Sequence, residues 1–157
     1  MEVQLKRVTE ENKEEVVKLH GKEEQRDCTR TVAESLEKIE TKSEEDHSEY
    51  IPFAIYDDET VVGFMLYTYE DETTNNYWIE GMIIDEKYQG KGYGRAGLKK
   101  LIDWISENFR NCSEIRAAVS TDNESAYELY KNFGFVPSGE MKGEESILYL
   151  VVQTASD

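Results

Sequence analysis

Four runs of the chain are rich in β-branched and aromatic residues that recur with the short period of strands. They cover residues 3–8, 51–56, 61–69 and 77–85. The second and third runs are joined by Asp57-Asp58-Glu59-Thr60, which predicts a hairpin, and the fourth run completes an antiparallel meander. Three more strands are expected near the end of the chain, at residues 115–120, 135–141 and 146–153.

Four other segments carry apolar residues at helical spacing, so we expect each to form a helix. The first covers residues 12–20 and is closed by Gly21, and the second starts at Thr31. The third directly follows a glycine cluster, with Leu98, Leu101, Ile102, Ile105 and Phe109 on one face, and the fourth covers residues 124–133 and ends at Gly134. We therefore predict one α/β (α+β) domain over residues 1–157, with a mixed, mostly antiparallel sheet of six to seven strands and about four helices.

The composition narrows the classes of protein to consider. No stretch approaches the ~18 apolar residues of a membrane span, and the N-terminus lacks the layout of a signal peptide, so we expect a soluble, cytoplasmic protein. With 34 acidic and 18 basic residues, the formal net charge is −16. This charge makes nucleic acid a poor partner and favours a basic amine, although acidity that serves only solubility is the alternative explanation.

Metal chemistry and thiol chemistry are not expected. Cys28 and Cys112 lie far apart, belong to no ligand pattern, and have only His20 and His47 as candidate histidine partners. We therefore predict no metal site, and we interpret both cysteines as reduced thiols without a catalytic task.

The glycine cluster Gln89-Gly90-Lys91-Gly92-Tyr93-Gly94 lies between a predicted strand and a predicted helix. Backbone N–H groups at a helix start, without Cβ atoms around them, form a cradle for an anion. The Walker A pattern fails because Gly92 follows Lys91, and the dinucleotide pattern fails because Arg95 stands at its third glycine. A turn that serves only chain reversal is the alternative interpretation.

The stretch from Tyr88 to Gly94 resembles the pyrophosphate motif of the GNAT superfamily of N-acetyltransferases. A second segment, residues 123–135, resembles the block N-x-x-A-x-x-L-Y-x-x-x-G-F of that family at the expected distance downstream. The order of predicted elements agrees as well, so the resemblance covers essentially the whole chain. It implies acetyl-CoA as co-substrate, bound where the strand ending near Asp85 and the strand at 115–120 splay apart.

The resemblance also implies a role for particular residues. Backbone amides of Met82, Ile83 and Ile84 would hold the pantetheine arm and the thioester carbonyl. The pyrophosphate would lie against Gln89, Gly90, Lys91, Gly92, Tyr93, Gly94 and Arg95, and Asn123, Ala126 and Tyr130 would face the cofactor from the other side.

Transfer to an amine requires a base, because an aliphatic amine with a pKa of ~10.4 is protonated at neutral pH. Glu80 is the candidate, acting directly or through water, and a solvent-facing strand glutamate is the alternative. Tyr130 occupies the family position of the acid that protonates the leaving thiolate, and a core aromatic is its alternative. An amide near Met82 would meet the oxyanion, and the transfer would be direct because neither motif contains a cysteine.

The predicted acceptor is a polyamine such as spermidine or spermine, because residues 78–80 and 83–94 look similar to bacterial spermine/spermidine acetyltransferases. Carboxylates that would meet such a polycation are Glu23, Glu24, Asp27, Glu70, Asp71 and Glu72, each with a solvated surface charge as its alternative. Gly81 departs from the expected pattern beside Glu80 and indicates a β-bulge or a wider pocket.

Other acceptors therefore stay open: a protein N-terminus, a lysine side chain or an aminoglycoside. A non-catalytic acyl-CoA sensor is the rival outside enzymology, and the presence of Tyr130 and the glycines argues against it. A homodimer is a further expectation, because superfamily members are often dimers and residues 147–152 offer an edge strand, with an internal strand as the alternative interpretation of that run.

Overall fold

The computed structural model describes residues 2–21, 31–70, 73 and 76–152, and the strand-like runs of the sequence form a single sheet there. The strands are β1 (Gln4–Arg7), β2 (Glu49–Asp57), β3 (Thr60–Tyr69), β4 (Tyr77–Ile84), β5 (Glu114–Ser120), β6 (Val136–Lys142) and β7 (Glu145–Val151). The helices are α1 (Lys13–Val17), α2 (Val32–Glu40), α3 (Tyr93–Asn108) and α4 (Glu124–Phe133), with a 3-10 turn η2 (Glu86–Tyr88).

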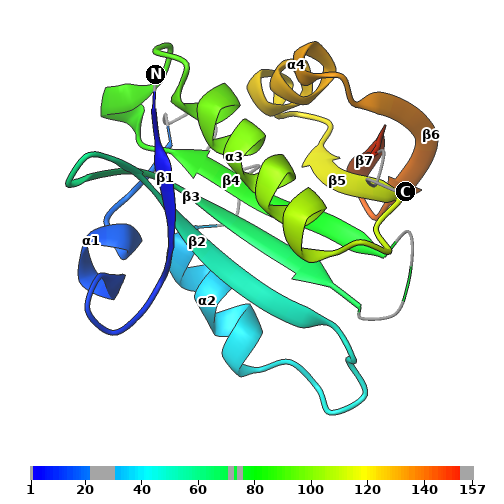
Figure 1. Cartoon of the computed structure of the whole chain (residues 1–157), viewed down its shortest axis with the longest axis horizontal. Helices are drawn as coiled ribbons and strands as arrows, with labels where there is room; N and C mark the ends of the chain where they lie inside the picture. Colours follow the sequence, from blue (N-terminus) through cyan, green and yellow to red (C-terminus); the bar gives the residue numbers. More distant parts are fainter. Residues whose placement is uncertain (1, 22–30, 71–72, 74–75, 153–157) are drawn as a thin grey trace.

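Among the described residues the seven strands lie in the order β1-β2-β3-β4-β5-β7-β6. Every neighbouring pair is antiparallel except β4 and β5, which run parallel. A parallel pair needs a crossover connection, and α3 supplies it between β4 and β5 (Figure 1). The predicted mixed, mostly antiparallel sheet with about four helices is confirmed.

The two faces of the sheet bury separate clusters, because side chains alternate along each strand. On one face, α3 packs Leu98, Leu101 and Ile105 against the central strands. On the other face, α1 and α2 bring Val16 and Val32 into a second cluster with strand residues (Figure 1).

The first helix is shorter than the sequence-based expectation. The helix expected over residues 12–20 covers only Lys13–Val17, because the chain then turns toward β4 and the His20 backbone bonds with Asp85 and Glu86 instead of continuing a helix. Of the run at 147–152, all but the last residue lies in β7, which pairs with β5 and β6. Its interpretation as an internal strand is confirmed, and the edge-strand argument for a dimer is wrong.

A β-bulge interrupts β4 at the residue pair Glu80 and Gly81. Leu66 of β3 pairs with Gly81, but the next residue of β3, Tyr67, pairs with Ile79, so Glu80 is an extra residue in the ladder. The bulge that Gly81 indicated in the sequence is therefore present.

The parallel strands β4 and β5 separate at the same level. Their pairing comprises only Trp78 with Arg116 and Ile79 with Ala117, and beyond these pairs the two strands diverge. The predicted splay is confirmed: Ile79 is the last residue of β4 that pairs with β5, and the divergence begins at the bulged Glu80. The bulge and the divergence together open a space in the middle of the sheet.

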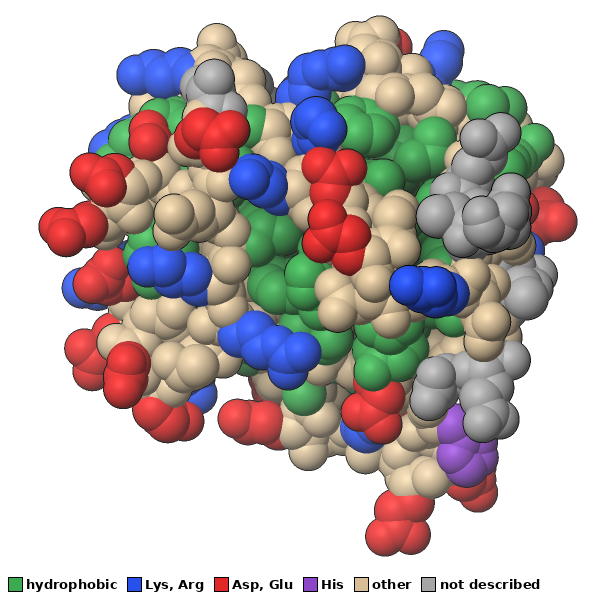
Figure 2. Space-filling model, in the orientation of Figure 1, with side chains coloured by type: hydrophobic (Ala, Val, Ile, Leu, Met, Phe, Trp, Pro, Cys, Tyr) green, Lys and Arg blue, Asp and Glu red, His purple; other side chains and the backbone are tan. Residues whose placement is uncertain are grey.

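No helix formed by the described residues is long and apolar enough to cross a membrane. On the face shown in Figure 2, acidic and basic side chains are interspersed, with apolar side chains visible between them.

Candidate active site

The glycine loop connects the end of β4 to the start of α3 through η2. Gly90 and Gly92 have φ angles of 76° and 92°, a left-handed conformation that glycine adopts at little cost. The Gln89 side chain donates from Nε2 to the Ile84 carbonyl oxygen at 2.9 Å, which ties the loop back to the end of the strand. Helix α3 then begins at Tyr93, so the loop lies at its N-terminus.

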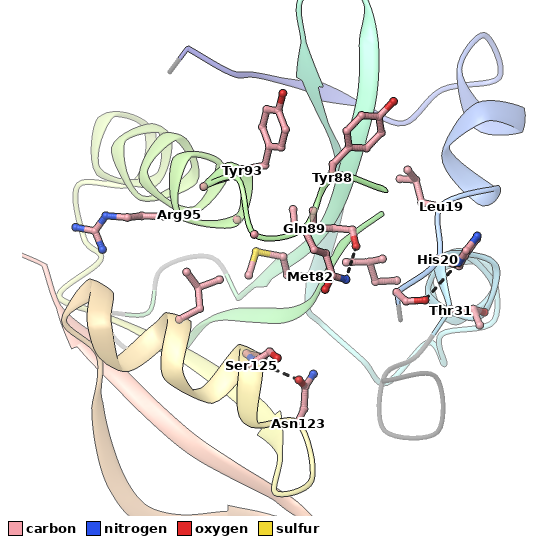
Figure 3. A pocket seen from close by; sticks show the side chains of 18 residues that line it. Leu19, His20, Thr31, Met82, Tyr88, Gln89, Tyr93, Arg95, Asn123 and Ser125 are labelled. Carbon is pink, nitrogen blue, oxygen red and sulfur yellow. Dashed lines mark hydrogen bonds between the residues drawn. The ribbon is translucent and has the colours of Figure 1, made fainter. Parts of the chain in front are cut away.

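A cavity of about 370 Å³, which we call the loop cavity, lies between the glycine loop and α4. Figure 3 shows Met82 between these two walls, with Gln89 on one side and Asn123 and Ser125 on the other. Its lining comprises Leu19, His20, Gly21, Thr31, Met82, Ile83, Ile84, Tyr88, Gln89, Gly90, Gly92, Tyr93, Gly94, Arg95, Asn123, Ser125, Ala126 and Leu129.

The far wall of the loop cavity comes from the segments next to α1 and α2. The buried Asp85 side chain, 4% exposed, accepts the His20 backbone N–H at 3.1 Å, and the Glu86 N–H donates to the His20 carbonyl at 2.9 Å. Thr31 caps α2 in a reciprocal capping box with Glu34. These bonds hold residues 19–21 and Thr31 at the cavity.

Two side chains of the loop and early α3 brace this region. The Tyr93 hydroxyl donates to the Asp57 carboxylate at the end of β2, and this contact raises the pKa of Tyr93. The Arg95 guanidinium lies 5.4 Å from the centre of the Phe133 ring and reaches the Asn132 carbonyl at 3.4 Å, so it links α3 to the end of α4.

A second cavity of about 140 Å³, the fork cavity, lies where β4 and β5 diverge. It is lined by Ser35, Phe64, Glu80, Gly81, Met82, Ile83, Ala118, Val119, Ser120, Asn123, Ala126, Tyr130 and Glu145. Met82, Ile83, Asn123 and Ala126 line both cavities, so the two spaces adjoin. The Asn123 side chain caps α4 by accepting the Ala126 N–H at 3.2 Å.

Tyr130 is the buried phenol of the fork cavity. Its side chain is 3% exposed and packs edge-on against Phe135, with ring centres 5.1 Å apart. Burial raises the pKa of Tyr130, because the phenolate form loses its hydration. The hydroxyl is therefore protonated at neutral and moderately alkaline pH.

The carboxylates of the fork cavity come from Glu80 on β4 and Glu145 on β7. Glu80 is 9% exposed in its side chain and lies near two ammonium groups, with Lys38 at 2.5 Å from Oε2 and Lys142 at 3.6 Å from Oε1. Neither lysine lines the cavity, and none of the described lining residues is basic.

The structure assembles most, but not all, of the predicted site residues. Every predicted cofactor-binding residue lines the loop cavity except Lys91, which is exposed, and Tyr130, which lines the fork cavity with Glu80. Glu70 lies at the other end of β4 from the glycine loop, where its carboxylate accepts the Asn76 side-chain amide at 2.5 Å. Glu23, Glu24, Asp27, Asp71 and Glu72 lie outside the described residues.

Other lining residues were not predicted. Ser125 and Leu129 fall within the second motif, so their place on α4 was available as a signal. Four other residues line the cavities because of long-range packing, and no local sequence pattern predicts that they do: Leu19, Thr31, Ser35 and Glu145. The described residues contain no cluster of three metal-ligating side chains.

Comparison with known proteins decides the family. A sequence model described as the acetyltransferase (GNAT) family matches residues 10–135, which is most of the chain. The chain belongs to the GNAT family. It is 32% identical over 146 residues to spermine/spermidine N(1)-acetyltransferase of Bacillus subtilis, covering 90% of this chain and 92% of that one.

Solved structures agree in fold. The spermidine N-acetyltransferase of Vibrio cholerae in complex with CoA and spermine aligns with a TM-score of 0.66 and 17% identity, over 96% of this chain and 95% of that one. AAC(6')-Ib in complex with ribostamycin and coenzyme A aligns with a TM-score of 0.73 and 16% identity, over 100% of this chain and 99% of that one. GNAT acetyltransferases use acetyl-CoA, so this GNAT protein is an acetyl-CoA-dependent N-acetyltransferase.

Proposed function

We propose that this GNAT enzyme transfers the acetyl group of acetyl-CoA to a primary amine of a small polycation such as spermidine or spermine, directly and in a ternary complex. The observation that carries the proposal is the charge of the fork cavity. Its described lining contains the carboxylates of Glu80 and Glu145 and no basic side chain. Lys38 and Lys142 pair with Glu80 from outside this lining, and the remaining carboxylate, that of Glu145, favours a cationic acceptor over an anionic one.

Two further observations support a polyamine. The Bacillus subtilis relative, 32% identical over most of both chains, is a spermine/spermidine acetyltransferase. The net charge of −16 adds a long-range field that attracts polycations.

The lining of the loop cavity supports the proposal that acetyl-CoA binds there. Left-handed Gly90 and Gly92 next to the start of α3 suit a pyrophosphate, and no acidic side chain lines this cavity among the described residues. In this proposal residues 89–95 hold the phosphates, the strand residues Met82, Ile83 and Ile84 hold the pantetheine arm, and the thioester lies where the two cavities adjoin.

Glu80 and Tyr130 carry out the proton transfers of the proposed reaction. Both side chains line the fork cavity, from β4 and from α4. Glu80 accepts the proton that the ammonium must lose before its nitrogen attacks, directly or through a water. After the attack the nitrogen carries one proton more than the amide product, and this proton passes to Tyr130 as Tyr130, kept protonated by its burial, gives its own proton to the sulfur and the C–S bond breaks. The Met82 amide meets the negative charge on the carbonyl oxygen.

The test is CoA release from acetyl-CoA with spermidine, spermine, short diamines, aminoglycosides and N-terminal peptides. We expect spermidine or spermine to give the highest kcat/KM. Glu80→Gln is expected to lower kcat by about 10²-fold or more, whereas the matched variant Glu145→Gln is expected to raise the KM of the amine with a smaller effect on kcat.

The other outcomes decide between the alternatives. A clear preference for peptides or aminoglycosides would replace the polyamine with that acceptor. Saturable acetyl-CoA binding without release on any amine would favour the sensor. Equal kcat in Glu80→Gln and the wild type would remove Glu80 from the proton transfer.

A further inference from the structure

The carboxylate of Glu80 holds two cations that belong to the chain itself. Lys38 Nζ lies 2.5 Å from Oε2 and Lys142 Nζ lies 3.6 Å from Oε1, so each carboxylate oxygen has its own ammonium group. One ammonium would neutralise the carboxylate. The second cation marks a position beside Glu80 that favours positive charge.

Aromatic rings lie beside both ammonium groups. Lys38 Nζ is 5.7 Å from the centre of the Tyr50 ring, and Lys142 Nζ is 4.8 Å from that of Trp78. Trp78 lies two residues before Glu80 on β4. The guanidinium carbon of Arg116 lies 5.6 Å from the centre of the Trp78 ring. A carboxylate flanked by aromatic faces is a combination that binds organic ammonium ions.

The two lysines are held to different degrees. Lys38 is on helix α2, is 35% exposed, and makes the short contact. Lys142 is the last residue of β6, one of the two edge strands among the described residues, is 53% exposed, and makes the longer contact. An exposed and loosely held ion pair adds little free energy, so Lys142 is the cation that another ammonium can replace.

We propose that Glu80 and Trp78 form an ammonium subsite that Lys142 occupies in the free enzyme, and that an ammonium group of the acceptor replaces Lys142 there. The inference rests on the proposed function, in which the acceptor is a cationic amine. Lys38 keeps its bond to Glu80 throughout and positions the carboxylate. Lys142 acts as a tethered competitor, because two ammonium groups at one position repel each other.

The test compares Lys142→Met with Lys131→Met. Lys131 on α4 also lies over an aromatic ring, 5.5 Å from the centre of Tyr127, and lines neither cavity, so its variant removes the same charge elsewhere. We expect Lys142→Met to lower the KM of spermidine about two- to five-fold, the range of a weak ion pair, and Lys131→Met to keep the wild-type KM. Lys142→Arg keeps the charge and is expected to give a KM closer to that of the wild type.

Calorimetric binding of spermidine in the presence of CoA gives a readout without turnover, and the dissociation constant is expected to follow the KM. An unchanged or raised KM and dissociation constant in Lys142→Met, beside a wild type that acetylates spermidine, would overturn the competitor role and leave the proposed function standing. A wild type that neither acetylates nor binds any amine would overturn both.

Discussion

The loop cavity and the fork cavity adjoin each other but differ in how they are built. Glycine backbone and the N-terminus of α3 form one wall of the loop cavity, and its described lining carries Arg95 and no carboxylate. The fork cavity is lined by side chains from β3, β4, β5, β7, α2 and α4, with two carboxylates and no basic residue among those described. The two cavities on either side of Met82 therefore differ in the charged side chains of their described lining.

The difference between the two cavities indicates which of them governs the use of acetyl-CoA and which governs catalysis and the choice of amine. A backbone cradle tolerates many side chains but few changes of φ, whereas a side-chain cavity is changed by single substitutions. Variants of the loop cavity should therefore alter the use of acetyl-CoA, and variants of the fork cavity should alter catalysis and the choice of amine.

The largest effect is expected from Tyr130→Phe, which removes one hydroxyl from the fork cavity and keeps the ring against Phe135. We expect kcat to fall by about 10²-fold or more with little change in the KM of acetyl-CoA, since a general acid acts in the transition state. Steady-state kinetics measures this split. Tyr127→Phe, on the same helix but outside both cavities, is the control, and equal kcat in the two variants would assign Tyr130 to packing alone.

The next effect separates two glycines on facing strands. A Cβ atom at Gly63 would lie 2.8 Å from the Ile83 carbonyl oxygen, whereas one at Gly81 would meet nothing within 4 Å. Gly63→Ala is expected to lower the free energy of unfolding by about 1–3 kcal/mol, measured by urea denaturation. Gly81→Ala should keep the wild-type free energy of unfolding and should raise the KM of spermine more than the KM of a short diamine. An equal loss of stability in Gly63→Ala and Gly81→Ala would show that there is no room for a Cβ atom at Gly81.

A smaller effect is expected for Gly90→Ala in the loop cavity. Both Gly90 and Gly139 have positive φ and open space around them, so alanine at either position costs about 1 kcal/mol of backbone strain. Only Gly90 lines a cavity. Gly90→Ala should therefore raise the KM of acetyl-CoA while Gly139→Ala leaves it unchanged. A matching rise in both would mean that the change reflects stability and not the cradle.

The smallest effect concerns stability at alkaline pH. Burial raises the pKa of Cys112 to about 11, and it raises the pKa of Tyr130 as well. Above about pH 9 the unfolded chain loses these protons while the folded chain keeps them, so the free energy of unfolding should fall as the pH rises. Denaturation at pH 7, 9 and 10 measures the slope. Cys112→Ala should make the slope shallower, and an unchanged slope would contradict the linkage.

The sequence predicted the loop cavity better than the fork cavity, and locality is the reason. Residues 89–95 and 123–135 each carry their signal within one short segment, so the glycine loop, α3 and α4 were placed correctly, and Gly81 indicated the bulge. By contrast, Glu145 reaches the fork cavity through the pairing of β7 with β5, which no short pattern encodes.

Long-range pairing also decides the surroundings of a correctly placed residue. Glu80 was a candidate from its place on the strand, but its partners lie on α2 and β6, far along the chain. The length of α1 was overestimated for the same reason, because the backbone bonds of His20 to Asp85 and Glu86 compete with another helical turn. Apolar spacing records which residues are buried, and it does not record where the chain leaves the helix.

The bulge at Glu80 and Gly81 has a consequence for insertions and deletions in β4. The bulge shifts the alternation of side chains between the two faces of the sheet by one residue. Ile79 and Met82 are three positions apart and both pack on the α3 side, although an uninterrupted strand would place them on opposite faces. Deleting Gly81 would place Met82 two positions after Ile79, so a regular strand would keep Met82, Ile83 and Ile84 on their present faces and Ile83 in the cluster under α2. A β4 of the present length without the bulge would instead turn Met82, Ile83 and Ile84 over, so the bulge is what keeps the end of the strand in phase with its start.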